Sequence, residues 1–345
     1  MFHLPVMLVC ALGAMRAAPP ATETPEPPAT SPALATIFHG EVTLVGDGYT
    51  FTEGPCWIPG TPAAAAPDEK PNAQPDAKSA PAPAGTPGYF IFCDRSPADG
   101  GVVYRWTGEG KPTPWRTPAG LAIGAAVGDG TSVVFAETQD RRITRVPIVD
   151  GTPGQPTVLA ASFEGKRLNA TNDLVVKRDG SVYFTDPTFF TPKPALELDF
   201  NGVYRVTPDG TLTLLDRFGA LPNGLCFSPD ESRLYVNDFG NNKVMVYDVA
   251  PDGTLGNKRL FADLTTLGIE SRGRADGLRC DVNGNVYTTG PLGIIVLSPD
   301  GAKITSLTVP NASNLAFGGS DGRTLLITAG RSVYRVNTAH AGAPR

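Results

Sequence analysis

Short apolar runs recur along the whole chain, and a polar turn closes each of them. Typical examples are SVYFTD at 181–186, NVYTTG at 285–290 and RTLLITA at 323–329. Runs of this length, rich in β-branched and aromatic residues and bounded by Gly, Asn and Asp, predict strands rather than helices. The large numbers of glycine (39) and proline (34) also favour many tight turns over long helices. We therefore expect an all-β chain.

These strands belong to a repeat. Four segments align without gaps, each with a polar opening residue and a turn residue seven positions later. They are NDLVVKRDG from Asn172, NGLCFSPDE from Asn223, DGLRCDVNG from Asp276 and NLAFGGSDG from Asn314. A fifth copy opens at Ala122, and a sixth opens at Glu53 and is interrupted by an insertion. Asp-Gly and Asn-Gly steps between two β-rich runs are typical of hairpins.

The spacing of the copies predicts the architecture. A unit of roughly 40–50 residues with four short strands is the blade of a β-propeller. Six copies predict a six-bladed β-propeller over residues 37–338, with four-stranded blades around a central channel. We expect the strand near FHGEVTLVG, at 38–46, to complete the last blade and close the ring, which removes the exposed sheet edge.

Three segments lie outside the repeat. Residues 1–18 contain an apolar run too short to span a bilayer and are typical of a signal peptide. This favours export to the periplasm or the medium, with no membrane contact in the mature form; a cytoplasmic protein with an apolar N-terminus is the alternative. Residues 19–36 read as a disordered Pro-rich tether, and 339–345 as a C-terminal tail.

The insertion, residues 59–88, is rich in proline and alanine and has no apolar face to bury. We expect a solvated spacer within one hairpin of the first blade. Cys56 and Cys93 flank that hairpin and are the better candidates for a disulfide in an exported protein. Cys226 and Cys280 lie in different repeats and are expected to be buried thiols.

Charge and histidine content exclude several functions. Lys+Arg number 29 and Asp+Glu 34, a net charge of −5, which argues against nucleic-acid binding. The three histidines, His3, His39 and His340, lie near the chain ends. A Ser-His-Asp triad or a histidine-ligated zinc site in the body of the chain is therefore excluded.

The opening residues of the repeats are the candidate chemistry. Each begins the innermost strand of its blade, so all six should surround one mouth of the channel: Glu53, Ala122, Asn172, Asn223, Asp276 and Asn314. Converging carboxylates repel one another unless they are protonated or bridged by a cation. Two carboxylates with amide oxygens suit Ca²⁺, Mg²⁺ or Mn²⁺. The alternative is that Asn-Gly and Asp-Gly serve only as turn pairs, which leaves Glu53 unexplained.

A series of motifs resembles one known family. The motifs are TEGPCW at 52–57, NDLVVKRDGSVYFTDP at 172–187, LPNGLCFSPDESRLYVND at 221–238, ADGLRCDVNGNVYTTGPLGIIVLSPDG at 275–301 and NASNLAFGGSDGRTLLITAG at 311–330. They are similar to those of the SMP-30/gluconolactonase/luciferin-regenerating-enzyme-like family, above all to its exported bacterial gluconolactonases. The resemblance implies one divalent cation at the axis (Ca²⁺, Mg²⁺, Mn²⁺ or Zn²⁺, with Ca²⁺ favoured).

The ligands that the resemblance implies are Glu53, Asn223 and Asp276, with Asn172 at or next to the metal and in contact with substrate. The chain departs from the family at Ala122, where members often have Asn. It also has Ala170 where animal members have Arg, and Arg274-Ala275 before Asp276 where Pro is common. These departures affect substrate contacts and leave the sugar specificity open.

The expected function is therefore a metal-dependent lactone hydrolase of the gluconolactonase type, a monomer that opens small sugar lactones. Asp276 is the candidate base for a water that the cation activates, and Asn172 would orient the carbonyl or a hydroxyl. Asp173 and Asp186 are expected to make strand-end and turn hydrogen bonds rather than to take part in catalysis. Two alternatives remain: a propeller esterase or phosphotriesterase, and a ligand-binding propeller with a structural cation. The paraoxonase-like variant of the first depends on histidines that the blades lack.

Overall fold

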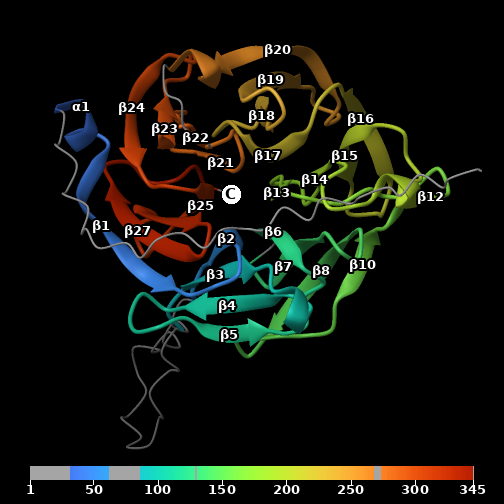
Figure 1. Ribbon diagram of the computed structural model, residues 1–345, viewed down its shortest axis with the longest axis horizontal. Helices are drawn as coiled ribbons and strands as arrows, with labels where there is room; N and C mark the ends of the chain where they lie inside the picture. The colour runs from blue at the N-terminus through green and yellow to red at the C-terminus, as the bar shows by residue number, and fades with distance from the viewer. Residues whose placement is uncertain (1–31, 62–85, 129, 268–272, 345) are drawn as a thin grey trace, which may run out of the picture. The chain divides into compact units, whose positions relative to one another are not determined.

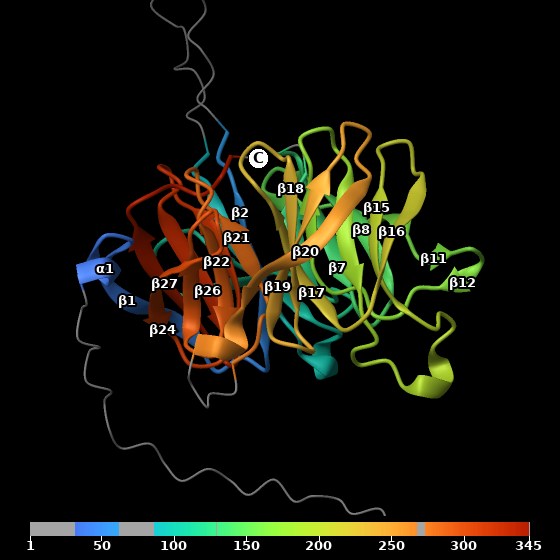
Figure 2. The same ribbon diagram turned by 90° about the horizontal axis from the view of Figure 1, so that it is seen from above.

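The computed structural model describes residues 32–61, 86–128, 130–267 and 273–344. Six antiparallel sheets follow one another around a central axis in Figure 1, and Figure 2 shows their strands from the side. This arrangement confirms the predicted six-bladed β-propeller. The expected signal peptide and most of the tether and of the insertion lie outside the described residues. Among the described residues, no helix is long and apolar enough to cross a membrane.

In blades 1 to 5 the strands follow chain order from the axis outwards. Blade 1 contains β2 (Thr52–Ile58), β3 (Tyr89–Asp94), β4 (Val102–Trp106) and β5 (Thr113–Arg116). Blade 2 contains β6 (Ala122–Val127), β7 (Ser132–Glu137), β8 (Arg142–Val149) and β10 (Thr157–Ala160), with β9 (Thr152–Pro153) paired to β8. Blade 3 contains β13 (Leu174–Val176), β14 (Val182–Asp186), β15 (Asn201–Val206) and β16 (Leu212–Phe218).

Blades 4 and 5 have the same order, whereas blade 6 has the N-terminal strand outermost. Blade 4 contains β17 (Pro222–Phe227), β18 (Arg233–Asp238), β19 (Lys243–Val249) and β20 (Leu255–Asp263). Blade 5 contains β21 (Leu278–Cys280), β22 (Val286–Gly290), β23 (Gly293–Leu297) and β24 (Lys303–Thr308). Blade 6 contains β25 (Ala312–Gly318), β26 (Thr324–Ala329), β27 (Ser332–Thr338) and β1 (Phe38–Asp47).

Short elements occupy the connections. They are the two-stranded sheet of β11 (Ser162–Phe163) and β12 (Lys166–Arg167), the 3₁₀ turns Pro97–Asp99, Lys193–Ala195 and Leu264–Leu267, and the helix α1 (Pro32–Ala35). Helix α1 lies within the range expected to be a disordered tether, so the last part of that range is ordered.

The sixth blade is built from both ends of the propeller. Strand β1 pairs antiparallel with β27, with Phe38 opposite Thr338 and Asp47 opposite Ser332. The N-terminal strand therefore supplies the outermost strand of the sheet that the C-terminal strands form. This confirms the expected closure of the ring.

The hydrophobic core is a ring of six clusters, one between each pair of neighbouring blades. Ile91 of blade 1, for example, packs in one cluster with Phe135 of blade 2, and Tyr183 of blade 3 packs in another with Phe227 of blade 4. Each inner strand contacts a neighbour on both faces, and β7 is buried along its whole length. This explains why the inner strands are nearly continuous apolar runs.

The predicted disulfide is wrong. Cys56 and Cys93 are both buried and form no disulfide with each other. Glu53 faces Cys93 across the β2–β3 pair, whereas Cys56 faces Ile91 after a register shift. Position along the hairpin placed the two thiols together, but they do not face each other in the pair: even without the register shift, Cys56 would face Phe90 rather than Cys93. Cys226 and Cys280 are buried thiols as expected, with their sulfur atoms 3.6 Å apart between blades 4 and 5.

Candidate metal centre and active site

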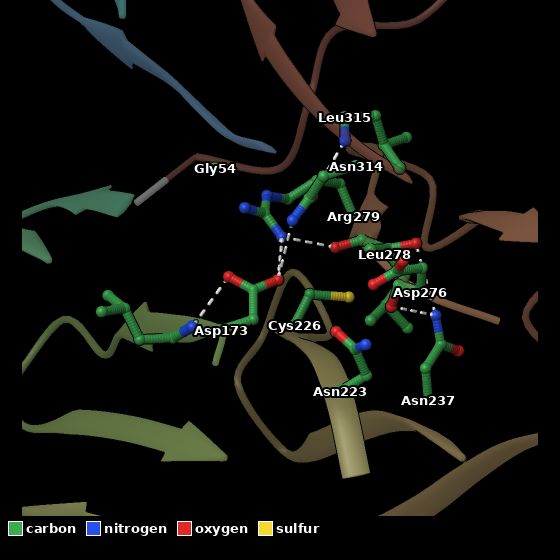
Figure 3. A network of polar contacts seen from close by, with 12 residues as sticks. Gly54, Asp173, Asn223, Cys226, Asn237, Asp276, Leu278, Arg279, Asn314 and Leu315 are labelled. Atoms are coloured by element: carbon green, nitrogen blue, oxygen red, sulfur yellow. Dashed lines mark hydrogen bonds and ion pairs between the residues drawn. The ribbon is translucent and has the colours of Figure 1, made fainter. Parts of the chain in front are cut away.

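The opening residues of the six repeats all lie at one end of the inner strands. Ala122 is the first residue of β6. Glu53 and Asn223 are the second residues of β2 and β17, and Asn314 is the third residue of β25. Asn172 and Asp276 come two residues before β13 and β21. Since every inner strand runs in the same direction along the axis, these positions share one mouth of the propeller. Figure 3 shows Asn223, Asp276 and Asn314 in this region.

Glycines after the opening residues allow neighbouring inner strands to come close. The amide N–H of Gly224 donates to the carbonyl of Asp276 at 2.9 Å, and a Cβ on Gly224 would lie 2.3 Å from that oxygen. A Cβ on Gly277 would lie 2.2 Å from Oδ1 of Asn314. The Asn-Gly and Asp-Gly pairs at these openings therefore serve packing around the axis, which the interpretation as ordinary turn pairs does not explain.

Two carboxyl groups in the mouth have strongly raised pKa values. Burial, followed by the charge of Asp173, raises the pKa of Asp276 to about 8, and a hydrogen bond from Asn223 opposes this shift. Burial, followed by the charges of Asp276 and Asp173, raises the pKa of Glu53 well above its usual value. The N–H of Gly54, 3.2 Å from Oε2 of Glu53, acts in the opposite direction. Without a counter-charge, these groups favour their protonated forms.

The donor set fits a hard divalent cation. Oδ1 of Asn223 is buried and accepts no hydrogen bond from the described residues, although its residue has only 3% exposure. A buried amide oxygen without a donor next to two repelling carboxylates is suited to a cation that prefers oxygen ligands. In the described ranges, no three His, Cys, Asp or Glu side chains cluster as a metal site. The candidate set therefore depends on amide oxygens as well as carboxylates.

Asn172 and Ala122, the remaining opening residues of blades 3 and 2, differ in whether they offer a ligand atom. Asn172 is buried, its backbone N–H donates to Thr185, and its side chain makes no hydrogen bond to another described residue. Ala122 offers no ligand and pairs in register with Glu137. The Glu137 carboxylate is bound by Arg116 at 2.5 Å and by Arg142 at 2.6 Å, so this carboxylate is already paired and is not a candidate ligand.

Asp173 has a larger role than the sequence indicated. Its Oδ1 accepts the N–H of Leu174 at 2.8 Å, as expected for strand-end bonding. Its Oδ2 lies 3.2 Å from Nδ2 of Asn314 and 3.8 Å from Nη1 of Arg279, in blades 6 and 5. Figure 3 shows these three side chains pointing toward one another. One signal in the sequence could have indicated this contact: Arg279 is a charged residue in the buried inner strand of its repeat, so it needs a carboxylate partner.

Asp186, in contrast, has the structural role that was expected. Its two carboxylate oxygens accept the backbone N–H groups of Asn169 and Ala170, each at 2.8 Å. Burial raises its pKa to about 7, and these two hydrogen bonds oppose the shift. The side chain holds the segment that leads to Asn172.

The opposite mouth is covered by the C-terminal residues. Val282 donates to Ala341 at 3.0 Å, Gly342 donates to Gly322 at 3.0 Å, and Ala343 donates to Cys280 at 2.9 Å. The tail and Arg279 line a cavity of about 80 Å³. A larger cavity of about 840 Å³ also opens on this face, but none of the opening residues of the repeats lines it. The candidate site residues therefore lie at the other mouth, away from both of these cavities.

Comparison with known proteins agrees with the propeller fold. The chain is 31% identical over 279 residues to a gluconolactonase of Zymomonas mobilis, covering 74% of this chain and 77% of the relative. It is 30% identical to an L-arabinolactonase of Azospirillum brasilense, covering 64% of this chain and 73% of the relative. The structure of a gluconolactonase from Xanthomonas campestris superimposes with a TM-score of 0.70 at 29% identity, over 91% of this chain and 95% of that one. Residues 88–331 match the SMP-30/Gluconolactonase/LRE-like region, and the chain therefore belongs to this family.

Proposed function

We propose that this protein is a metal-dependent lactone hydrolase, a carboxylic ester hydrolase that opens sugar lactones. Relatives named for gluconolactone and arabinolactone hydrolysis support the reaction class. The observation that carries the proposal is the convergence of Glu53 and Asp276 beside the Oδ1 of Asn223, which has no hydrogen-bond donor among the described residues.

Glu53, Asn223 and Asp276 would hold the cation, with Asn172 beside them. Their oxygen donors favour Ca²⁺ and also accept Mg²⁺ or Mn²⁺. The cation supplies a Lewis acid for the lactone carbonyl and a positive charge that favours the ionised carboxylates. Glu53 is the more deeply buried of the two carboxylates and is assigned to binding, whereas Asp276 keeps partial exposure.

Asp276 is the general base. It takes a proton from the water that attacks the carbonyl carbon, and it returns this proton to the ring oxygen as the ester C–O bond breaks. The products are the open-chain hydroxy acid and the free base. Because the bound cation favours the ionised form of Asp276, the carboxylate is able to accept a proton near neutral pH. Asn172 is free to donate a hydrogen bond to the carbonyl or to a sugar hydroxyl.

The direct test is pH-stat hydrolysis of D-glucono-1,5-lactone, beside other aldonolactones, by the purified full chain. We expect turnover that exhaustive chelation abolishes and that Ca²⁺ or Mn²⁺ restores. Undiminished activity in the chelated protein, with no metal by elemental analysis, would contradict the metal-dependent mechanism. Absence of turnover on every lactone, with the metal present, would leave a ligand-binding propeller as the better explanation.

A further inference from the structure

Arg95 lies at the same end of the propeller as the candidate metal centre. It follows β3, whose Cys93 faces Glu53 across the strand pair. Its guanidinium carbon is 4.0 Å from the centre of the Phe190 ring. Phe190 belongs to the connection after β14 in blade 3, so the contact joins two blades that are not neighbours. The pair therefore spans the end of blade 2, where Ala122 carries no polar side chain.

Phe190 is held in an unfavourable conformation that exposes its ring. Its φ is 59°, which a bulky residue rarely adopts, and its exposed fraction is 57%. The neighbouring Thr191 anchors the loop, because its hydroxyl donates to the carbonyl of Asn169 at 2.8 Å. Phe189 packs edge-on against Phe239, with ring centres 5.1 Å apart. Strain and exposure of this kind at one residue point to a role in binding.

The guanidinium of Arg95 has no ionic partner among the described residues. Its Nε is buried and makes no hydrogen bond with them. Burial alone lowers its pKa, with no contribution from a neighbouring charge. Arg116, Arg142 and Arg279, in contrast, all pair with carboxylates. A half-buried cation without a counter-charge is costly, and an anionic ligand would remove that cost.

We infer that Arg95 and Phe190 form a subsite for an anionic group on the substrate, so that the preferred substrates are sugar lactones that carry a carboxylate or a phosphate. This inference rests on the proposed function. The ring of Phe190 covers one face of the guanidinium and leaves its N–H edge for the ligand. That planar edge matches the two oxygens of a carboxylate or phosphate. The lactone carbonyl would then lie toward Glu53 and Asp276, and the charged end toward Arg95.

The test compares kcat/KM for one neutral and two anionic lactones. The probes are D-glucono-1,5-lactone, its 6-phosphate and D-glucaro-1,4-lactone. Comparison of the 6-phosphate with the glucarolactone shows whether the subsite prefers a phosphate or a carboxylate on the substrate. We expect wild type to prefer at least one anionic lactone over the neutral one. Arg95→Gln should reduce that preference about 10- to 100-fold, the effect of a lost charge-assisted hydrogen bond. Arg95→Lys should keep a larger part of the preference.

Arg105→Gln is the matched control. Arg105 also stacks on an aromatic ring, 3.9 Å from the centre of Tyr89, and its Nε also lacks a described partner. It belongs to β4, the third strand of blade 1, so its loss should leave the anionic preference unchanged. Equal losses on all three lactones in Arg95→Gln, or no anionic preference in wild type, would overturn the inference.

Calorimetry separates this inference from the proposed function. The probes are gluconate, 6-phosphogluconate and glucarate, titrated into the Ca²⁺-loaded full chain. If no lactone is hydrolysed but glucarate or 6-phosphogluconate binds more tightly than gluconate, and Arg95→Gln removes the difference, the subsite stands and the lactonase proposal fails. If lactones are hydrolysed but Arg95→Gln leaves all three affinities unchanged, the subsite alone fails.

Discussion

Asn314 donates from Nδ2 to Oδ2 of Asp173 at 3.2 Å, although the two residues are 141 positions apart in the chain. They belong to blades 6 and 3, which lie on opposite sides of a six-bladed ring. Their contact therefore crosses the axis. With Arg279, they form a polar layer between the carboxylates of Glu53 and Asp276 and the C-terminal residues at the other mouth.

Asp173→Asn should destabilise the fold, because it leaves the buried guanidinium of Arg279 without its counter-charge. Breaking a buried ion pair in this way costs about 3–5 kcal/mol. Urea unfolding in the presence of chelator gives the change in unfolding free energy. The double variant Asp173→Asn with Arg279→Met should recover much of the loss, since no unpaired charge remains. A single variant within about 0.5 kcal/mol of wild type would show that the pair is unimportant for stability.

Asp276→Asn should lower kcat by about 10²- to 10⁴-fold, the usual contribution of a general base. The amide keeps the size of the side chain and one oxygen donor but cannot accept the proton. Turnover is measured against cation concentration, and circular dichroism confirms folding. Near-normal turnover at saturating cation would rule out Asp276 as the base.

Glu53→Gln should act mainly through cation affinity. Removing one of two anionic ligands weakens a hard-cation site, so the cation concentration for half-maximal activity should rise. Activity should return in part at high Ca²⁺ or Mn²⁺, which is the opposite of the expectation for Asp276→Asn. A loss of turnover that no cation concentration restores would place Glu53 in the chemistry itself.

Cation affinity should increase with pH up to about 8. In the cation-free protein, the pKa of Asp276 is raised to about 8 and that of Glu53 is raised well above its usual value. Binding must therefore release protons, and each proton released changes the affinity up to about tenfold per pH unit. Calorimetry in two buffers of different ionisation enthalpy counts the protons. The same affinity at pH 5.5 and 7.5 would contradict the raised pKa values.

The free energy of unfolding of the cation-free protein should decrease as pH rises. The pKa of Asp276 is about 8 in the folded protein and near 4 in the unfolded chain. Its contribution to the free energy of unfolding is therefore fully present below about pH 4. The contribution is lost as pH rises through about 8. Chelated protein should therefore become less stable between pH 5 and 8, and Asp276→Asn should reduce this dependence.

Deleting residues 62–85 should leave folding and turnover nearly unchanged. The ends of the segment already meet, with Oγ1 of Thr61 2.9 Å from Oγ1 of Thr86. An Asn-Gly turn can therefore replace the segment, and shortening a loop changes its closure entropy only slightly. Thermal unfolding and lactone turnover check this. Loss of soluble protein, or a tenfold drop in turnover, would show that the segment packs on the blade or covers a mouth.

The fold and the opening residues could be predicted from the sequence because the repeat determines both. One polar residue in each copy, followed by a hairpin at constant spacing, was enough to place Glu53, Asn223 and Asp276 at one mouth. The closure by residues 38–47 also followed, since the sixth copy lacked an outer strand.

Contacts between different copies could not be predicted in this way. The pairing of Asp173 with Arg279, and of Arg95 with Phe190, depends on how far blades 1, 3 and 5 reach across the axis. The spacing of residues along one chain carries no such information. The wrong disulfide has a related cause, because nearness along a hairpin does not say which residues face each other: Cys93 faces Glu53, and Cys56 faces Ile91.

The pairing of β1 with β27 determines how the molecule responds to force. Phe38 and Thr338 face each other at the end of the pair from which both chain ends leave. Once the hydrogen bonds of residues 339–343 have broken, tension between the two ends would separate this pair and then the next, instead of shearing all the hydrogen bonds of the strand pair together. Heat must disrupt the sheet cooperatively, but pulling needs to break only one rung at a time. A protein anchored at one end and pulled at the other would therefore open its ring at low force, while one held at a single end keeps the full strength of the closed propeller.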